Sequence, residues 1–148
     1  MAQRTQRPVI LKPANFVIMT LLRSGIKIGN MSLLTVRGRK SGQPRTTPVW
    51  LEEHNGQRWL ISPYGQVNWV RNLRASGEAT VTRGRRTERV SAVEPPVHEA
   101  APLLKQSLAA APSMLRGYFD VTPDAPLEDF EREVPRHPVF LLESATKQ

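Results

Sequence analysis

The chain has 148 residues, of which 39% are hydrophobic, enough for one domain with its own core and too few for two. Lys and Arg number 21 against 13 Asp and Glu, and the resulting net charge of +8 favours an anionic partner: a nucleic acid, a membrane surface or an anionic cofactor. The absence of cysteine excludes disulfides, thiolate nucleophiles and cysteine-ligated metals, and it permits a cytoplasmic location.

The N-terminal region divides into two parts. We expect residues 1–12, which are polar and basic, to form a flexible arm, and residues 13–148 to form a single domain. From Pro13 to about Gly25, apolar residues recur with helical spacing between basic margins. An apolar run of about a dozen residues is too short for a bilayer, which needs about twenty. We therefore expect a cytoplasmic protein with a helix over one end of the domain, and peripheral contact of that helix with an anionic membrane surface stays open.

The stretch from Val36 to Trp50 predicts a hairpin with a basic tip. Strand-forming residues stand on both sides of Gly38 to Pro44, and Arg37, Arg39, Lys40 and Arg45 place four cations within nine residues. A guanidinium group can bind two oxygens of a phosphate or a carboxylate at once, and glycine lets the backbone approach a ligand. The tip thus suits a polyanionic ligand, with a solvated basic turn as the alternative. It does not match a Walker-type phosphate loop, because its lysine precedes the second glycine and a strand follows.

The remaining elements indicate a small barrel. Asn55-Gly56 is a strong signal for a two-residue turn between strands. Short strands, a helix midway and a late helix before a closing strand predict a mainly β protein with helices (α+β), built as a closed barrel with peripheral helices, and they exclude a Rossmann fold. Residues 113–135 show no regular pattern. We expect strands over 49–53, 58–62, 79–83, 87–93 and 134–143, and helices over 67–75 and 99–111.

The sequence contains no recognisable set of catalytic side chains. Neither a Ser-His-Asp set nor a spaced pair of carboxylates appears. His54, His98 and His137 are scattered, so we expect each on the surface or in a turn and no metal site. This pattern fits an enzyme whose cofactor brings the chemistry.

Two motifs carry a family resemblance. The basic hairpin and the run Trp69-Val-Arg-Asn-Leu-Arg-Ala-Ser-Gly77 resemble the deazaflavin-dependent nitroreductase family, over roughly residues 30–145. The resemblance implies a split β-barrel of the flavin-reductase and pyridoxamine-phosphate-oxidase type, often dimeric, and coenzyme F420 (8-hydroxy-5-deazaflavin) as cofactor. FMN is the less similar option. The phosphate and polyglutamate tail of the coenzyme would bind at Arg39, Lys40, Ser41, Gly42, Gln43, Pro44 and Arg45, with Thr46, Thr47 and Pro48 continuing the match.

The resemblance also implies roles beyond the hairpin. Backbone amides around Ser62, Pro63, Tyr64 and Gly65 would serve the carbonyl oxygens of the ring. Trp69 and Asn72 share one helix face, where the indole would pack and the amide would bind the coenzyme or cap a loop. The substrate would contact Trp50, Met114, Tyr118 and Phe119, and a proton would come from Tyr118, Tyr64 or water.

The expected activity is hydride transfer from the reduced coenzyme to an electron-poor small molecule such as an enone, a quinone or a nitroaromatic. The run Tyr64-Gly65-Gln66-Val67-Asn68 departs from relatives, which commonly carry Gly-Gly, a nearby lysine and His-Pro or Asn-Pro here, so a non-catalytic carrier of a lipid-like or deazaflavin ligand stays open. Nucleic-acid binding would need aromatic residues among the cations. Only Trp50 and Tyr64 qualify, so no nucleic acid is expected as a partner.

Overall fold

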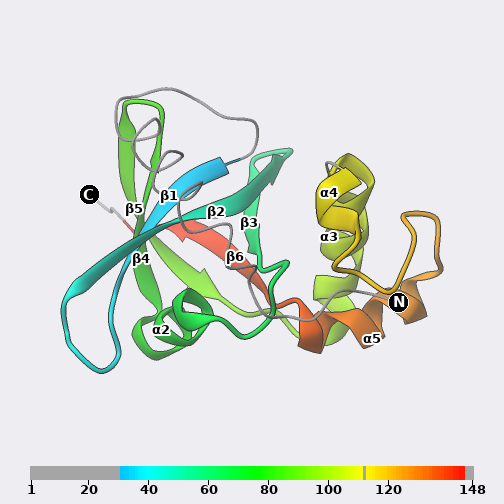
Figure 1. The fold of residues 1–148 in the computed structure, drawn as a ribbon. Coiled ribbons are helices and arrows are strands. Elements are labelled where there is room, and N and C mark those ends of the chain that lie inside the picture. The colour runs from blue at the N-terminus through cyan, green and yellow to red at the C-terminus, as the bar shows by residue number, and fades with distance from the viewer. Residues whose placement is uncertain (1–30, 112, 146–148) are drawn as a thin grey trace.

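A computed structural model describes residues 31–111 and 113–145, so the expected basic arm and N-terminal helix lie outside the described residues. Six antiparallel strands close into a barrel in the order β1-β2-β3-β6-β5-β4 (Figure 1). Pairing of β4 with β1 completes the ring. The predicted barrel with peripheral helices is confirmed. The strands are β1 (Met31–Arg37), β2 (Pro44–His54), β3 (Gln57–Ile61), β4 (Glu78–Arg83), β5 (Arg86–Val93) and β6 (Val139–Ser144).

Tight turns connect the first three strands as the sequence predicts. Asn55 and Gly56 have φ values of 55° and 78°, and this pair of positive angles is what a two-residue hairpin turn requires. The β1–β2 hairpin runs as far as the pair Arg37 and Pro44, which leaves Gly38 to Gln43 as its tip.

The interior of the barrel is closed by one helix. Helix α2 (Asn68–Ser76) buries Trp69, Val70 and Leu73 against the barrel core, and the indole of Trp69 lies 6.0 Å from the Phe140 ring. Gly77, with φ of 74°, ends the helix as expected. Helix α2 also packs against β1 and so lies beside the β1–β2 hairpin.

A second apolar layer lies outside the barrel. Side chains alternate along β2, so Val49 and Leu51 point into the barrel whereas Trp50 joins the outer cluster. That cluster packs against α3 (Val97–Ala110) and α5 (Leu127–Glu133), which Figure 1 shows beside the barrel, with the short α4 (Ser113–Arg116). The layer covers the outer face of β3 and β6 through Trp59, Ile61 and Val139.

The C-terminal part differs from the prediction. The closing strand begins at Val139, while Val134–Arg136 forms a 3₁₀ helix, η1. Pro135 and Pro138 lack the backbone N–H that strand pairing needs, which explains the late start. Helix α5 was not predicted in the region without a regular pattern. None of the helices in the described ranges is long and apolar enough to cross a membrane.

Candidate functional site

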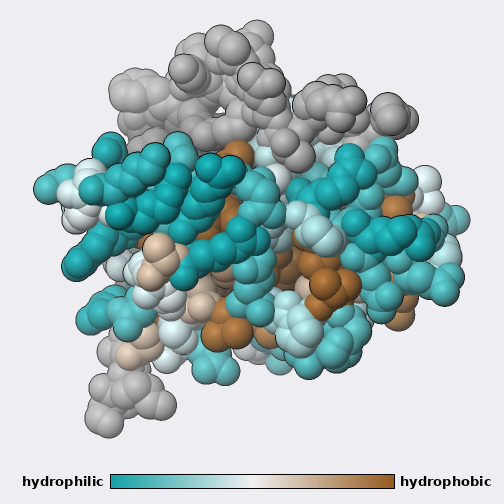
Figure 2. Space-filling view, turned by 90° about the horizontal axis from the view of Figure 1, so that it is seen from below, coloured by the Kyte–Doolittle hydropathy of each residue, from teal (hydrophilic) through white to brown (hydrophobic). Residues whose placement is uncertain are grey.

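An open groove of about 920 Å³ lies between the tip of the β1–β2 hairpin and the start of α2. Figure 2 views the molecule from below, and hydrophilic residues gather at its upper left, on the side where Figure 1 places the hairpin tip. The hairpin side of the groove is polar and basic, and the α2 side adds amides and one indole. Its lining residues are Val36, Gly38, Arg39, Lys40, Ser41, Arg45, Thr46, Thr47, Gln66, Val67, Asn68, Trp69 and Asn72.

The hairpin tip has a defined shape. The Gly38 N–H donates to the Gln43 carbonyl at 2.8 Å, and the Gly42 N–H donates to the Gly38 carbonyl at 2.9 Å. Gly42 has φ of 74°, which favours glycine. A Cβ at Gly38 would lie 2.8 Å from Ser41 Oγ, so a side chain there would displace Ser41. Both glycines therefore shape the tip.

A buried amide fastens this tip to the helix. Asn72 on α2 is only 6% exposed, and its Oδ1 accepts hydrogen bonds from the Arg39 backbone N–H at 3.1 Å and from Arg39 Nη1 at 2.7 Å. Of the two roles expected for this amide, the structure shows loop capping. The cap fixes both the backbone and the side chain of one groove cation.

The groove carries positive charge that carboxylates do not neutralise. Among the described residues, Arg39, Lys40 and Arg45 have no ion pair with an acidic side chain. Ser41 Oγ accepts from the Gln43 N–H at 3.1 Å and lies 3.5 Å from Arg45 Nη2. These groups are exposed and form the cationic wall of the groove.

The start of α2 adds a further positive potential. Its first turn contains no acidic residue, and no side chain caps it. A helix start of this kind presents free N–H groups and the positive end of the helix dipole, which together favour an anion. Because Val67 and Asn68 line the groove, the helix and the hairpin act on the same space.

A small apolar cavity of about 60 Å³ adjoins the groove, with Thr47, Val67 and Trp69 lining both. Its remaining wall includes Pro48, Trp50, Pro63, Tyr64 and Leu115. The Tyr64 ring meets the Tyr118 ring edge to face, with centroids 5.0 Å apart and planes at 86°. The polar groove therefore leads to an apolar end bordered by two tyrosines.

The structure places most of the residues named from the sequence around these two spaces. Arg39, Lys40, Ser41, Arg45, Thr47, Trp69 and Asn72 line the groove, and Trp50, Pro48, Pro63 and Tyr64 line the cavity. Gly42 and Pro44 face a separate groove of about 310 Å³ on the other side of the hairpin. Gln43 and Gly65 line none of the three, and the side chain of Met114 lies outside the described part.

The structure places three residues named from the sequence away from the groove and the cavity. The Ser62 N–H donates to the Pro138 carbonyl at 3.0 Å, and Pro63 has no N–H, so neither amide serves a ring. Phe119 is buried and stacks on His137, with centroids 4.0 Å apart, instead of lining the cavity. Of the two places expected for His137, surface or turn, the structure shows a turn, because His137 is 1% exposed and follows η1 in a bend. These residues face the layer between barrel and helices, which strand periodicity does not reveal.

Sequence reasoning also missed part of the groove. Gln66, Val67 and Asn68 line it, together with Gly38 and Val36. A signal was available, because Gln66 and Val67 directly precede, and Asn68 begins, a helix whose first turn lacks acidic residues.

Comparison with known proteins decides the family. A sequence model of the F420H(2)-dependent quinone reductase family matches residues 20–122. The chain belongs to this family. As a member it is an F420H2-dependent reductase, and coenzyme F420 is its cofactor. No curated protein matches the chain.

Solved structures share the fold of this reductase. An F420-H2 dependent reductase, FDR-A, has a TM-score of 0.55 at 22% identity, covering 80% of this chain and 98% of its own. A structure described as a domain-swapped dimer has a TM-score of 0.53 at 19% identity, covering 86% and 94%. A candidate pyridoxamine 5′-phosphate oxidase from Listeria innocua has a TM-score of 0.53 at 11% identity, covering 88% and 93%. These likenesses confirm the split-barrel fold.

The residues of the groove fit the cofactor of the family. Coenzyme F420 carries a phosphate and a carboxylate tail, and the groove offers two guanidinium groups, one ammonium, three hydroxyls and a helix start without acidic residues. Such donors match phosphate and carboxylate oxygens. The adjoining cavity, lined mostly by apolar side chains, suits an uncharged group more than a charged one.

Proposed function

We propose that this reductase binds the tail of coenzyme F420 along Arg39, Lys40, Ser41 and Arg45 and reduces an electron-poor small molecule at the apolar cavity. The observation that carries the proposal is the continuity of the two spaces, which share Thr47, Val67 and Trp69. When bound, the reduced coenzyme supplies a hydride equivalent, so the protein needs to bind, orient and exclude water.

The character of the cavity supports an acceptor such as a quinone, an enone or a nitroaromatic. Its wall is mostly apolar, with Trp50, Pro63 and Leu115 among its members. A cavity of about 60 Å³ admits only the reacting end of such a molecule. Acceptor choice should therefore depend on shape at Trp50 and Tyr64, since few polar groups are present to select a particular head group.

Two hydroxyl groups are candidates for the proton that must accompany the hydride. Tyr64 lines the cavity and Tyr118 contacts its ring. A phenol can donate a hydrogen bond to a developing oxyanion and pass on its proton, with water restoring it. We assign Tyr118 and Tyr64 this role jointly, because their edge contact holds them as a pair.

Titration tests the first half of the proposal. Oxidised F420, reduced F420 and FMN are added separately to the protein while absorbance and fluorescence are followed. Saturable binding of F420 that is tighter than binding of FMN is the expected result. Failure of F420 to bind would overturn the proposal.

A panel of acceptors tests the second half. With reduced F420 present, quinones, enones and nitroaromatics are compared in the wild type, Trp50→Phe and Tyr118→Phe. The first change should alter the order of preferred acceptors, since it frees space in the cavity wall. The second should slow turnover mildly, because Tyr64 and water remain as proton sources. Binding of F420 without reduction of any acceptor would instead favour the carrier function.

The assembly state is a further part of the proposal. We infer a homodimer, supported by the similarity in fold to the structure described as a domain-swapped dimer. Light scattering of the purified protein at several concentrations would show the mass, and a monomer at all of them would contradict the inference.

A further inference from the structure

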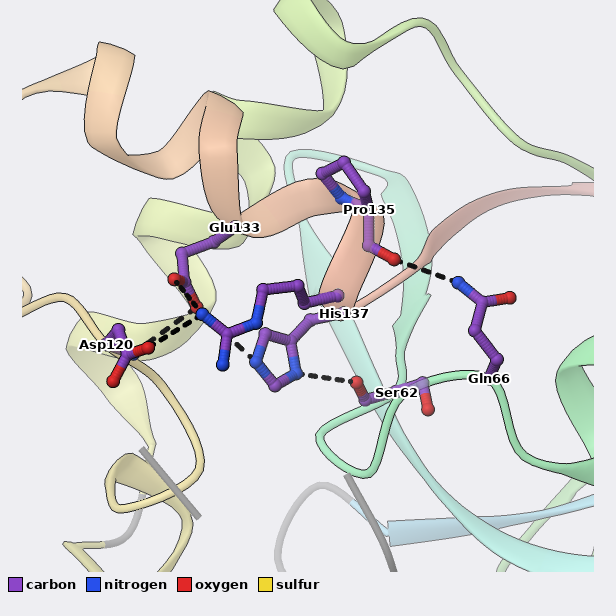
Figure 3. A network of polar contacts seen from close by, with 7 residues as sticks. Ser62, Gln66, Asp120, Glu133, Pro135 and His137 are labelled. Atoms are coloured by element: carbon purple, nitrogen blue, oxygen red, sulfur yellow. Dashed lines mark hydrogen bonds and ion pairs between the residues drawn. The ribbon is translucent and has the colours of Figure 1, made fainter. Parts of the chain in front are cut away.

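A polar cluster with a buried centre lies beside the apolar cavity without lining it. We call Asp120, Glu133, Arg136 and His137 the His137 cluster (Figure 3). His137 and Glu133 are 1% and 4% exposed. Burying ionisable groups costs free energy that an apolar core of equal size would avoid. The contacts of this cluster indicate what it does.

On one side the cluster holds the loop that carries Tyr64. His137 Nδ1 lies 3.2 Å from the Ser62 carbonyl oxygen, and this oxygen can only accept, so Nδ1 bears the hydrogen. The Ser62 N–H in turn donates to the Pro138 carbonyl at 3.0 Å. Gln66 Nε2 donates to the Pro135 carbonyl at 2.9 Å, as Figure 3 shows. Both ends of the 62–66 loop are therefore tied to residues 135–138.

On the other side the cluster holds the segment that carries Tyr118. The Phe119 ring stacks on the His137 imidazole at 4.0 Å with planes at 29°. The Asp120 N–H donates to Glu133 Oε1 at 3.3 Å, and Arg136 Nη1 donates to Asp120 Oδ2 at 2.7 Å. The residues two positions before and after Tyr64, and the two residues that follow Tyr118, are thus all held by residues 133–138.

Glu133 joins the two sides. Its Oε1, which accepts from Asp120, also lies 3.4 Å from His137 Nε2, within ion-pair range but outside hydrogen-bond geometry. Its Oε2 lies 3.5 Å from Arg136 Nη1. A shift of His137 would therefore displace both tyrosine segments.

We infer that His137, supported by Glu133, is a positioning residue that sets the placement of Tyr64 relative to Tyr118 and so the shape of the acceptor site. The inference rests on the proposed function, since the tyrosine pair matters only if an acceptor binds there. His137 itself touches neither the groove nor the cavity.

Two substitutions of His137 separate the roles of its ring nitrogens. His137→Asn keeps a donor close to the position of Nδ1, and His137→Gln keeps a nitrogen close to that of Nε2 and loses the bond to Ser62. Ser107→Ala is the control for lost stability, because Ser107 is a buried polar residue whose hydroxyl bonds Trp59 and Leu103 and neither tyrosine segment.

The first measurement is amide hydrogen exchange without coenzyme or acceptor. His137→Gln should raise exchange at residues 62–66 and 118–120 together, His137→Asn should raise it much less, and Ser107→Ala should leave both segments protected. Exchange unchanged in His137→Gln, or raised in the 62–66 loop alone, would overturn the inference. Because this measurement does not depend on activity, it tests the positioning role of His137 even when the wild type reduces no acceptor and the proposed function fails.

The second measurement is steady-state kinetics. His137→Gln should raise the acceptor KM about tenfold, the effect of one net hydrogen bond, while F420 affinity stays within about twofold. His137→Asn should recover most of the loss. An equal rise in KM in Ser107→Ala, or no rise in His137→Gln, would contradict positioning. Should His137→Gln not fold, Glu133→Gln replaces it with the same expected direction in both measurements.

Discussion

Asn72 Oδ1 lies 3.1 Å from the Arg39 backbone nitrogen and 2.7 Å from Arg39 Nη1, which joins helix α2 to the hairpin tip. One buried amide thus fixes one cation of the groove before any coenzyme arrives. Preorganised cations bind an anion more tightly than mobile ones, because less side-chain freedom is lost on binding.

Asn72→Ala should therefore weaken F420 binding without removing a charge. We expect an affinity loss on the order of tenfold, together with a stability loss of about 1 to 3 kcal/mol from the unsatisfied groups. Calorimetric titration and thermal unfolding measure the two effects. Asn72→Asp retains the acceptor, so exchange of the Arg39 amide should stay slow in that variant. Unchanged F420 affinity in Asn72→Ala would show that the cap has no part in binding.

Replacing Lys40 and Arg45 together by alanine should reduce F420 affinity by about 3 kcal/mol or more, roughly a hundredfold, because charge-assisted hydrogen bonds contribute about 1.5 to 3 kcal/mol each. Both side chains are exposed, so the melting temperature should change little. Binding is measured by fluorescence titration at several salt concentrations.

The matched control for that double variant is Arg85→Ala with Arg86→Ala. These exposed residues at the β4–β5 turn carry the same charge, and Figure 1 shows that turn and the β1–β2 tip at opposite ends of the barrel. The control should bind F420 nearly as the wild type does. Equal losses in the two double variants would mean that net charge, and not the hairpin, attracts the coenzyme.

Ser107→Ala should lower stability by about 1 to 3 kcal/mol, because it leaves a buried indole N–H without its acceptor. In the structure, Trp59 Nε1 donates to Ser107 Oγ at 2.7 Å, a bond between the barrel and α3. Chemical denaturation measures the loss. Ser107→Thr keeps the hydroxyl and should recover part of it, whereas equal stability of Ser107→Ala and the wild type would refute the importance of this bond.

The carboxylate of Glu88 should contribute to the stability of the folded state in a pH-dependent way. Its hydrogen bonds to Arg58, at 2.8 and 3.2 Å, lower the pKa of the Glu88 carboxyl in the folded state. A depressed pKa stabilises the folded state above the unfolded pKa of about 4.3, and that contribution is lost as pH falls through the folded value. The pair is partly exposed, so we expect about 0.2 to 1 kcal/mol at pH 7.

Denaturation of the wild type and Glu88→Gln between about pH 7 and pH 3 tests this dependence. The stability difference between the two proteins should be largest at neutral pH and shrink in acid. A difference that stays constant over the whole range would remove the electrostatic explanation.

Local features of the fold were predictable because their causes lie within a few residues. Positive φ at Asn55 and Gly56 follows from an Asn-Gly pair between two strands, and the stop at Gly77 follows from its place after a helical stretch. The cationic wall of Arg39, Lys40 and Arg45 was also predictable, since the β1–β2 hairpin carries all three side chains.

Proline explains the error at the C-terminal end. The run from Val134 to Glu143 has the apolar content of a strand, yet pairing begins at Val139. Pro135 and Pro138 cannot donate to a ladder, and the residues between them turn toward the helices instead. The carbonyls of both prolines accept from the 62–66 loop, a use that composition does not reveal.

The sequence by itself determined most of the strands, the tight turns and the charged hairpin tip, because backbone sterics and side-chain charge act between near neighbours. Only the tertiary structure decided that Asn72 meets Arg39, 33 positions away, and that His137 meets Ser62, 75 positions away. It also decided that Trp50 packs in the outer layer and Val49 inside the barrel. These outcomes depend on closure of the barrel and on where α3 and α5 pack, and each requires groups that no local pattern brings together.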